Sequence, residues 1–221
     1  MLPEKKTVLF FSAHPDDEMS SAALLCKLVK NKNKVICVYL TTSPKAVVAN
    51  SSEDKKRAIR KKEAGRAAKI IGYQTVFLDL DKPQLKITKR NIQEIRMLIK
   101  KYKPCMIFLH PDYDAHPTHV KVNKIITAAA AGLKVEKWFF ETWTPLIKPN
   151  FIYFFGKSEM KKKLKAIRCF RSQISRVDIS RAFLSLNEYR AALGNELLGE
   201  FGQAKKSETP LKYGEAFYIL S

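Results

Sequence analysis

Short apolar runs alternate with stretches of helical length along the first 135 residues of the chain. Four runs have the composition of buried strands, and they lie at residues 7–11, 35–40, 75–80 and 105–109. Four stretches have helical spacing and charged faces, and they lie at residues 19–30, 53–71, 88–101 and 117–131. This alternation predicts an α/β fold, a Rossmann-like, mostly parallel sheet with helices on both faces. An active site is then expected at the carboxyl ends of the strands.

Past residue 135 the alternation is looser. Strand-like runs lie at residues 138–142 and 151–155, and helical stretches lie at residues 158–167 and 180–193. A polar loop follows at residues 194–211, and a final extended segment lies at residues 213–220. A chain of 221 residues has the length of one domain. We therefore expect a single domain over residues 1–221, with a Rossmann-like core at 1–135 and a sheet extension and lid at 136–221.

Neither hydropathy nor cysteine spacing points to a membrane or to an oxidising compartment. No window reaches the ~18 consecutive apolar residues of a membrane span, and the apolar run near residue 8 is shorter than the core of a secretory signal. The cysteines lie in apolar segments without CxxC spacing, as free thiols in a reducing compartment do; they are Cys26, Cys37, Cys105 and Cys169. The expected location is therefore cytoplasmic, without a transmembrane segment.

Basic residues strongly outnumber acidic ones. The chain has 41 Lys and Arg against 21 Asp and Glu, a formal net charge of +20. Such a charge is compatible with nucleic acid, an anionic membrane surface or an acidic substrate. The lysines are spread over predicted helix faces, however. The aromatic residues lie in strand-like runs, whereas base-stacking platforms would lie among the lysines. We expect a solubilising surface and no requirement for nucleic acid.

All four histidines fall in two loops that follow predicted strands. The first loop, residues 13–18, has the sequence AHPDDE, and the second, residues 110–119, has the sequence HPDYDAHPTH. The histidines are His14 in the first loop and His110, His116 and His119 in the second. Both loops follow the carboxyl ends of predicted strands, so both are expected at the same edge of the sheet. Ligands bind at this edge in open α/β folds. Histidine and aspartate are ligands of open zinc sites, and the loops contain no cysteine for a structural zinc site.

Two of the pairs in these loops have the spacing of neighbours on a helix. His14 and Asp17 are three residues apart at one predicted helix start, as are His116 and His119 at another. The two pairs together predict a metal site. One further Asp and one further His then remain to act as base and as oxyanion stabiliser.

Each part of this pattern has an ordinary interpretation when it is taken alone. Asp16 or Asp17 could cap the helix that follows, and Asp112 and Asp114 could be turn residues. A single histidine is usually structural or lies at the surface. The combination is what predicts a metal or catalytic site.

At these residues the chain resembles the PIG-L/LmbE-like family of zinc-dependent N-deacetylases. The resemblance rests on AHPDDE at residues 13–18 and on the HxxH that runs from His116 to His119. Weaker similarities are R-x-x-E-A at residues 60–64, F-L-D at 77–79, S-Q at 172–173 and E-A-F at 215–217. The two main motifs are specific, and they occur in the expected order and placement.

The resemblance implies a hydrolase that removes an acetyl group from an N-acetylglucosamine-type sugar conjugate. His14, Asp17 and His119 would bind one Zn²⁺, and Fe²⁺ could occupy the same ligands. Asp16 would be the general base that takes a proton from the zinc-bound water. His116 would stabilise the tetrahedral oxyanion or protonate the leaving amine. These assignments agree with the pattern of residues described above.

Three further residues are expected near the site. Asp112 and Asp114 would orient His116 or His119 through hydrogen bonds. Arg60 would contact an anionic aglycone, although a solvated helix face explains this residue equally well. Residues 41–45 are TTSPK where many members of the family carry a glycine-bearing T-x-G, so the sugar itself is left open.

Two other functions are compatible with the same sequence. A zinc amidase could use this site on a non-sugar amide or a thiol conjugate. A basic protein that binds nucleic acid or an anionic surface could retain a vestigial site. The expected partner is a small N-acetylated sugar conjugate, and the chain is compatible with a homo-oligomer.

Overall fold

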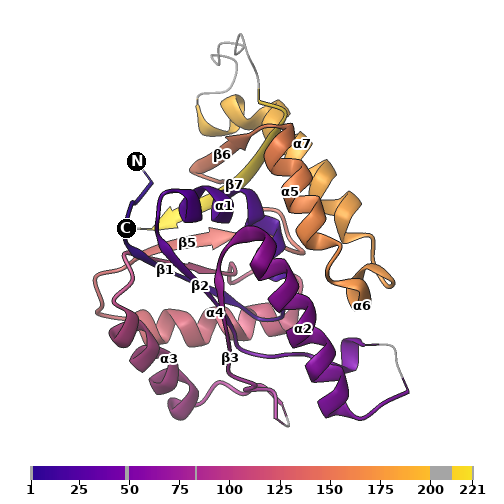
Figure 1. Cartoon of the computed structure of the whole chain (residues 1–221). Helices are drawn as coiled ribbons and strands as arrows, with labels where there is room; N and C mark the ends of the chain where they lie inside the picture. The colour runs from indigo at the N-terminus through magenta and orange to yellow at the C-terminus, as the bar shows by residue number, and fades with distance from the viewer. Residues whose placement is uncertain (1, 48–49, 83, 200–210, 221) are drawn as a thin grey trace.

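A computed structural model describes residues 2–47, 50–82, 84–199 and 211–220. These residues form a seven-stranded sheet with the strand order β3-β2-β1-β4-β5-β7-β6 (Figure 1). The strands are β1 Thr7–Ser12, β2 Lys34–Tyr39, β3 Gln74–Phe77, β4 Met106–Leu109, β5 Glu136–Phe140, β6 Phe151–Phe155 and β7 Tyr213–Leu220. Strands β1 to β5 run parallel to one another, whereas β7 pairs antiparallel with both β5 and β6. The predicted mostly parallel α/β sheet is confirmed.

Helices cover both faces of this sheet (Figure 1). They are α1 Ala22–Lys30, α2 Glu53–Ile71, α3 Lys89–Tyr102, α4 Pro117–Ala130, α5 Lys157–Ile167, α6 Arg171–Ile174 and α7 Ile179–Leu198, with short 3-10 turns η1 Asp17–Ser21 and η2 Pro44–Ala46. In β1, Val8 and Phe10 face the core under α1, α2 and α5, while Leu9 and Phe11 face the core under α3 and α4. The central strand is therefore buried on both sides, as its continuous apolar sequence predicts.

The structure differs from the sequence prediction mainly near the C-terminus. The predicted loop at 194–211 is wrong over its first residues, because α7 continues to Leu198. Gly194 lies inside this helix where a Cβ would come within 2.6 Å of the Phe154 ring, so the glycine serves close packing and not a turn. Residues 200–210 of that predicted loop lie outside the described residues. The short helix α6 was not expected.

Two boundary differences are smaller. Strand β3 ends at Phe77 and not at Leu80, because Asp79 has a φ of 50° and turns the chain. Strand β5 begins at Glu136, two residues before the predicted start.

Within the described residues, no helix combines the length and apolar character needed to cross a membrane.

A buried ion pair joins the C-terminal elements to the N-terminal half. Lys163 of α5 is fully buried and donates to Glu215 of β7 (2.7 Å), to the Asn187 side chain (2.8 Å) and to the Ser20 carbonyl (2.6 Å). Glu215 in turn accepts the backbone N–H groups of Ala23 and Leu24, at 2.9 and 2.8 Å, at the start of α1. Each end of the pair therefore has several partners, which such burial requires.

Removing one partner of this pair tests its contribution to stability. The substitution Lys163→Met leaves the Glu215 carboxylate buried and uncompensated, and we expect it to lower the free energy of unfolding by about 3–5 kcal/mol. Lys161→Met is the matched control on the exposed side of the same helix, with an expected change within about 0.5 kcal/mol. Urea denaturation followed by circular dichroism measures both. Equal stability of the two variants would contradict the assigned role.

Candidate functional site

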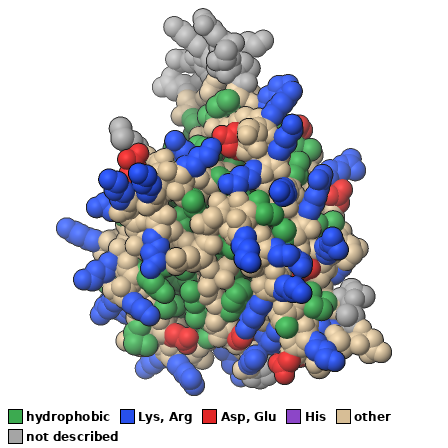
Figure 2. Space-filling model, viewed as in Figure 1, with side chains coloured by type: hydrophobic (Ala, Val, Ile, Leu, Met, Phe, Trp, Pro, Cys, Tyr) green, Lys and Arg blue, Asp and Glu red, His purple; other side chains and the backbone are tan. Residues whose placement is uncertain are grey.

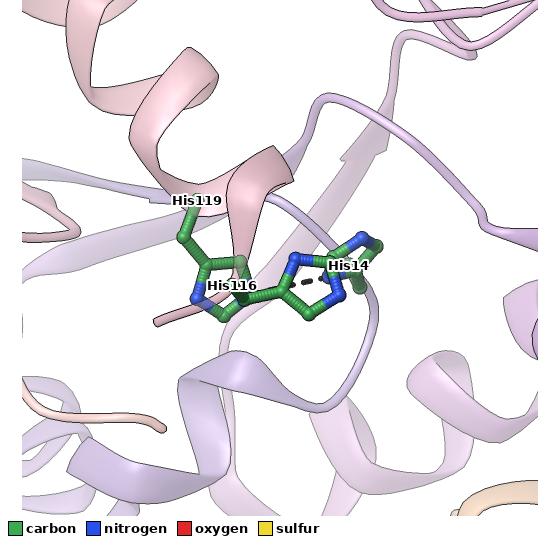
Figure 3. A group of neighbouring side chains, drawn as sticks. All are labelled: His14, His116 and His119. Carbon is green, nitrogen blue, oxygen red and sulfur yellow. Dashed lines mark hydrogen bonds between the residues drawn. The ribbon is translucent and has the colours of Figure 1, made fainter. Parts of the chain in front are cut away.

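The two histidine-bearing loops meet at the carboxyl edge of the sheet because β1 and β4 are adjacent and parallel. His14 lies on the loop after β1. His116 is the N-cap of α4, where Pro117 at the first helical position favours the helix start, and His119 lies in the first turn. Figure 3 shows His116 and His119 projecting from this end of α4 toward His14. Their ring centroids lie 4.6–5.2 Å apart.

Donor atoms of three side chains in this cluster lie close to the separations expected of ligands to one metal ion. His119 Nε2 lies 3.3 Å from His14 Nδ1 and 3.3 Å from Asp17 Oδ1, and His14 Nδ1 lies 3.7 Å from Asp17 Oδ2. Ligands about 2.0–2.2 Å from a tetrahedral zinc ion lie roughly 3.3–3.6 Å from one another. All three side chains are buried or nearly so. Two imidazoles and one carboxylate at this spacing therefore fit a divalent cation.

A carboxylate behind His119 determines which of its nitrogens faces this cluster. Asp114 Oδ1 lies 3.1 Å from His119 Nδ1, so this nitrogen donates to Asp114 and Nε2 is the nitrogen that faces His14 and Asp17. Asp114 is itself held by the His116 backbone N–H and the Thr142 hydroxyl, each at 2.8 Å. Burial opposes ionisation of the His119 ring and of the Asp114 carboxyl group. The carboxylates of Asp17 and Asp114 nevertheless raise the pKa of His119 to about 9, and hydrogen bonding to His119 lowers the pKa of Asp114 to about 2.

His110 links the two loops and has its own hydrogen-bond partners. Because Thr142 donates to Asp114, its oxygen can only accept from His110 Nδ1–H, at 3.4 Å. His110 Nε2 then accepts the Ala13 backbone N–H at 3.1 Å. Burial lowers the pKa of His110 to about 4, which keeps the ring neutral. Although His110 Nε2 also lies 3.3 Å from Asp17 Oδ2, its lone pair is already used, so the donor set of His14, Asp17 and His119 is favoured.

Thr142 was not expected from the sequence. It lies just after β5, where a single threonine between Glu141 and Trp143 gives no recognisable signal. Glu141 holds this segment in place, since it is buried against Arg190 of α7 and accepts the Leu146 backbone N–H at 2.7 Å. The orienting carboxylate Asp114 thus depends on a residue that is identified only from the structure.

Asp112 and Asp114 have different positions although they are two residues apart. Asp114 contacts His119, as the sequence predicts for one of the two carboxylates. Asp112 is exposed and makes no hydrogen bond or ion pair with any described residue. It lines a separate apolar cavity with Pro111 and Tyr113. The structure therefore does not bring Asp112 to His116 or His119.

Asp16 lies beside the donor set in an uncommon backbone conformation. Its φ is 123°, a value that residues other than glycine rarely adopt. The Glu18 carboxylate holds this conformation by accepting the Asp16 backbone N–H at 3.0 Å. Glu18 is fully buried and also accepts from the hydroxyls of Tyr39 and Tyr73, each at 2.7 Å. Burial raises the pKa of Asp16 to about 6, although the Arg60 guanidinium lowers it.

The R-x-x-E segment of α2 reaches the site from a third direction. Arg60 is 1% exposed, and its Nη2 lies 3.3 Å from Asp16 Oδ1, so the solvated helix face considered for it is wrong. Its Nε and Nη1 atoms are buried without a hydrogen-bond partner among the described residues. One helical turn later, Glu63 accepts from the backbone N–H (2.8 Å) and the hydroxyl (2.6 Å) of Ser172. The R-x-x-E and S-Q segments are therefore in direct contact.

The comparison with protein families agrees with this geometry. A family model described as PIG-L, GlcNAc-PI de-N-acetylase, matches residues 9–130. This range covers more than half of the chain and includes both histidine-bearing loops.

The chain belongs to the PIG-L family.

Solved structures similar to this PIG-L family member share its fold over nearly its whole length. 4-Carboxy-2-hydroxymuconate hydratase (GalB) from Pseudomonas putida is 18% identical, with a TM-score of 0.82, and the match covers 98% of this chain and 96% of the hydratase. N,N'-diacetylchitobiose deacetylase from Pyrococcus horikoshii is 24% identical, with a TM-score of 0.78 and coverages of 97% and 84%. A zinc-inhibited form of teicoplanin deacetylase Orf2 is 14% identical, with a TM-score of 0.71 and coverages of 97% and 98%. Since this fold occurs in a hydratase and in deacetylases, function must be argued from the site.

The contrast between Asp112 and Asp114 provides a direct test of the orienting carboxylate. Asp114→Asn removes the charge behind His119, and we expect the affinity for Zn²⁺ to fall about 10- to 100-fold, the usual cost of losing such a partner. Asp112→Asn is the same substitution two residues away and is expected to have no effect. Competition with a chromophoric chelator measures both affinities. If both variants bind zinc as tightly as the unmodified protein, Asp114 does not orient a ligand.

Proposed function

We propose that this chain is a zinc-dependent hydrolase that removes the acetyl group from an N-acetylglucosamine-type sugar conjugate. The observation that carries the proposal is the position of one carboxylate, Asp16, outside a complete donor set. His14, Asp17 and His119 are arranged to hold one divalent ion, and Asp16 is left next to them without a ligand role. A hydrolase that uses a metal needs this combination of ligands and a separate base.

The residues around the metal position would divide the reaction between them. A bound Zn²⁺ polarises an amide carbonyl and lowers the pKa of water toward ~7. Asp16 accepts the proton of the attacking water at its carboxylate, and Arg60 fixes the direction of that carboxylate. Water adds to the amide carbon, the C–N bond breaks as the leaving nitrogen takes the proton held by Asp16, and acetate and a free amine leave.

His116 has the protonation state of a hydrogen-bond donor. Its Nδ1 accepts the Thr118 backbone N–H at 3.2 Å, which places the ring proton on Nε2. Burial lowers the pKa of His116 to about 4, so the ring is neutral near pH 7. A neutral imidazole with its N–H directed at the reacting group stabilises a developing oxyanion, one of the two roles considered for this residue.

A polar cavity beside the site supports a sugar as the amine half of the substrate. It has a volume of about 230 Å³ and borders His14 and Thr118. Its walls include hydroxyl, amide and ammonium groups from Thr41, Ser43, Gln84, Lys45 and Lys121. Such groups form hydrogen bonds to sugar hydroxyls.

The basic surface does not favour the nucleic-acid alternative. Figure 2 shows Lys and Arg side chains spread over the whole visible face, among hydrophobic and uncharged groups, and not gathered into one stripe. Proteins that bind nucleic acid usually concentrate basic residues along one face or groove. The distribution on this face fits a solubilising role better.

Acetate release from a defined panel tests the proposed function. The panel contains N-acetylglucosamine, N,N'-diacetylchitobiose, phosphate-bearing N-acetylglucosaminyl conjugates and, for the amidase alternative, non-sugar acetamides. We expect the zinc-loaded protein to release acetate from at least one sugar, with activity lost on chelation and restored by Zn²⁺. His119→Ala removes a ligand and is expected to abolish both zinc binding and acetate release. Release from the non-sugar acetamides alone, or from no compound, would contradict the proposal.

Replacing the base separates metal binding from turnover. Asp16→Asn keeps the size of the side chain and leaves the three ligands in place, so we expect zinc to be retained while kcat falls about 10²- to 10⁴-fold. Asp112→Asn serves as the control for an aspartate outside the site. Metal content is measured by atomic emission and turnover by acetate release. Unchanged turnover in Asp16→Asn would exclude Asp16 as the base.

A further inference from the structure

A buried carboxylate without a ligand role, Glu18, connects the backbone of Asp16 to two tyrosines. Its Oε2 atom accepts the Asp16 backbone N–H at 3.0 Å. Its Oε1 atom accepts the hydroxyls of Tyr39 and Tyr73, each at 2.7 Å. The two hydroxyl oxygens lie 3.4 Å apart, because both approach the same acceptor atom. One oxygen of Glu18 therefore holds Asp16, while the other is held by the tyrosines.

The backbone of Asp16 needs such support. Its φ of 123° and ψ of −23° form a combination that residues hold only where the surrounding contacts impose it. The Asp16 carbonyl accepts the Met19 backbone N–H at 3.0 Å, and the Asp16 N–H donates to Glu18. Without a fixed acceptor for this N–H, the peptide before Asp16 can rotate toward an ordinary conformation. The Asp16 carboxylate would then leave its position beside the metal ligands.

Both tyrosines belong to rigid parts of the fold. Tyr39 is the last residue of β2 and is fully buried, and its ring stacks on Phe77 of β3 with centroids 4.9 Å apart. Tyr73 is buried and follows Gly72, which ends α2 with a φ of 106° and thereby turns the chain toward β3. Burial raises the pKa of both hydroxyls well above the usual value, so they remain hydrogen-bond donors.

Helix α2 thus contributes to both supports of Asp16. Arg60, within the helix, lies 3.3 Å from the Asp16 carboxylate. Tyr73, directly after the C-cap of the same helix, reaches the Asp16 backbone through Glu18. Neither tyrosine belongs to the donor set or lines the polar cavity. An effect of their hydroxyls on the reaction therefore has to pass through Glu18 and Asp16.

We propose that Tyr39 and Tyr73 are positioning residues that hold the base Asp16 in its reactive conformation through Glu18. The inference rests on the proposed function and extends it from the groups that contact the substrate to residues that fix one of those groups. Positioning of the base acts on turnover. It does not act on the metal ligands or on the groups that bind the sugar.

Removing the two hydroxyls tests the proposal. We expect Tyr39→Phe combined with Tyr73→Phe to lower kcat for acetate release about 10²-fold, the usual cost of displacing a reacting group by about 1 Å. Each single variant is expected to lower kcat by a smaller factor, and zinc content and KM are expected to stay unchanged. Tyr153→Phe is the matched control, because this half-buried tyrosine of β6 makes no hydrogen bond with any described residue. Unchanged kcat in the double variant would overturn the proposal.

A double-mutant cycle with Asp16→Asn separates positioning from a general loss of structure. If the hydroxyls act through Asp16, removing them costs no further kcat once the base is absent, because residues that act as a unit are not additive. A general structural defect would lower the residual kcat of Asp16→Asn by the same factor as in the unmodified protein. That result would overturn the proposal. If the variant without both hydroxyls does not fold, Tyr73→Phe alone, which keeps the Tyr39 donor, takes its place in the cycle.

Crystal structures of the unmodified protein and of the double variant give a readout that does not depend on activity. We expect the φ of Asp16 to remain positive in the unmodified protein and in Tyr153→Phe, and to change sign in the double variant. An unchanged Asp16 conformation in the double variant would overturn the proposal and leave the deacetylase intact. If the unmodified protein releases no acetate, the proposed function fails, and the positioning of Asp16 by the tyrosines is decided by these structures alone.

Discussion

The parallel pairing of β1 with β4 is the constraint on which the candidate site depends. The pairs run from Val8 with Met106 to Phe10 with Phe108, so the loops that follow the two strands leave the sheet side by side. A strand buried on both faces has little freedom to shift its register, because a slip would move its apolar side chains out of both cores. The hydrogen bond from the Ala13 backbone to His110 then locks the two loops directly, across 97 positions of sequence.

Neighbouring carboxylates acquire different properties from their surroundings. Burial would raise the pKa of Asp17, but the charge of His119 and its hydrogen bond to Asp17 hold that pKa well below its usual value. Asp16 pairs with Arg60, but burial outweighs this charge and raises the pKa of Asp16 to about 6. One carboxylate is thus kept ionised, as a ligand must be, while the next is suited to accept a proton near neutral pH. The hydrogen bond from the Asp16 backbone to Glu18 keeps the second one in position.

Much of the fold and part of the site could be predicted from sequence because their signals are local. Alternating apolar runs and helical stretches predict the parallel sheet, and helix α2 begins and ends where its charges and Gly72 indicate. The histidine loops are recognisable because strand ends gather functional residues. The roles of Thr142 and Arg60 could not be predicted, since each depends on contacts between distant elements. The same holds for Gly194, which the sequence suggests as a turn and the packing of Phe154 explains.

The central claim is that one set of side chains binds the metal while Asp16 stays free. A crystal structure of the zinc-loaded protein, with anomalous diffraction recorded on both sides of the zinc edge, tests it most directly. The account predicts a single anomalous peak bonded to His14 Nδ1, the Asp17 carboxylate and His119 Nε2, with Asp16 near it but not coordinated. A peak coordinated by His110 or by Asp16, or zinc found only at other positions, would contradict the account.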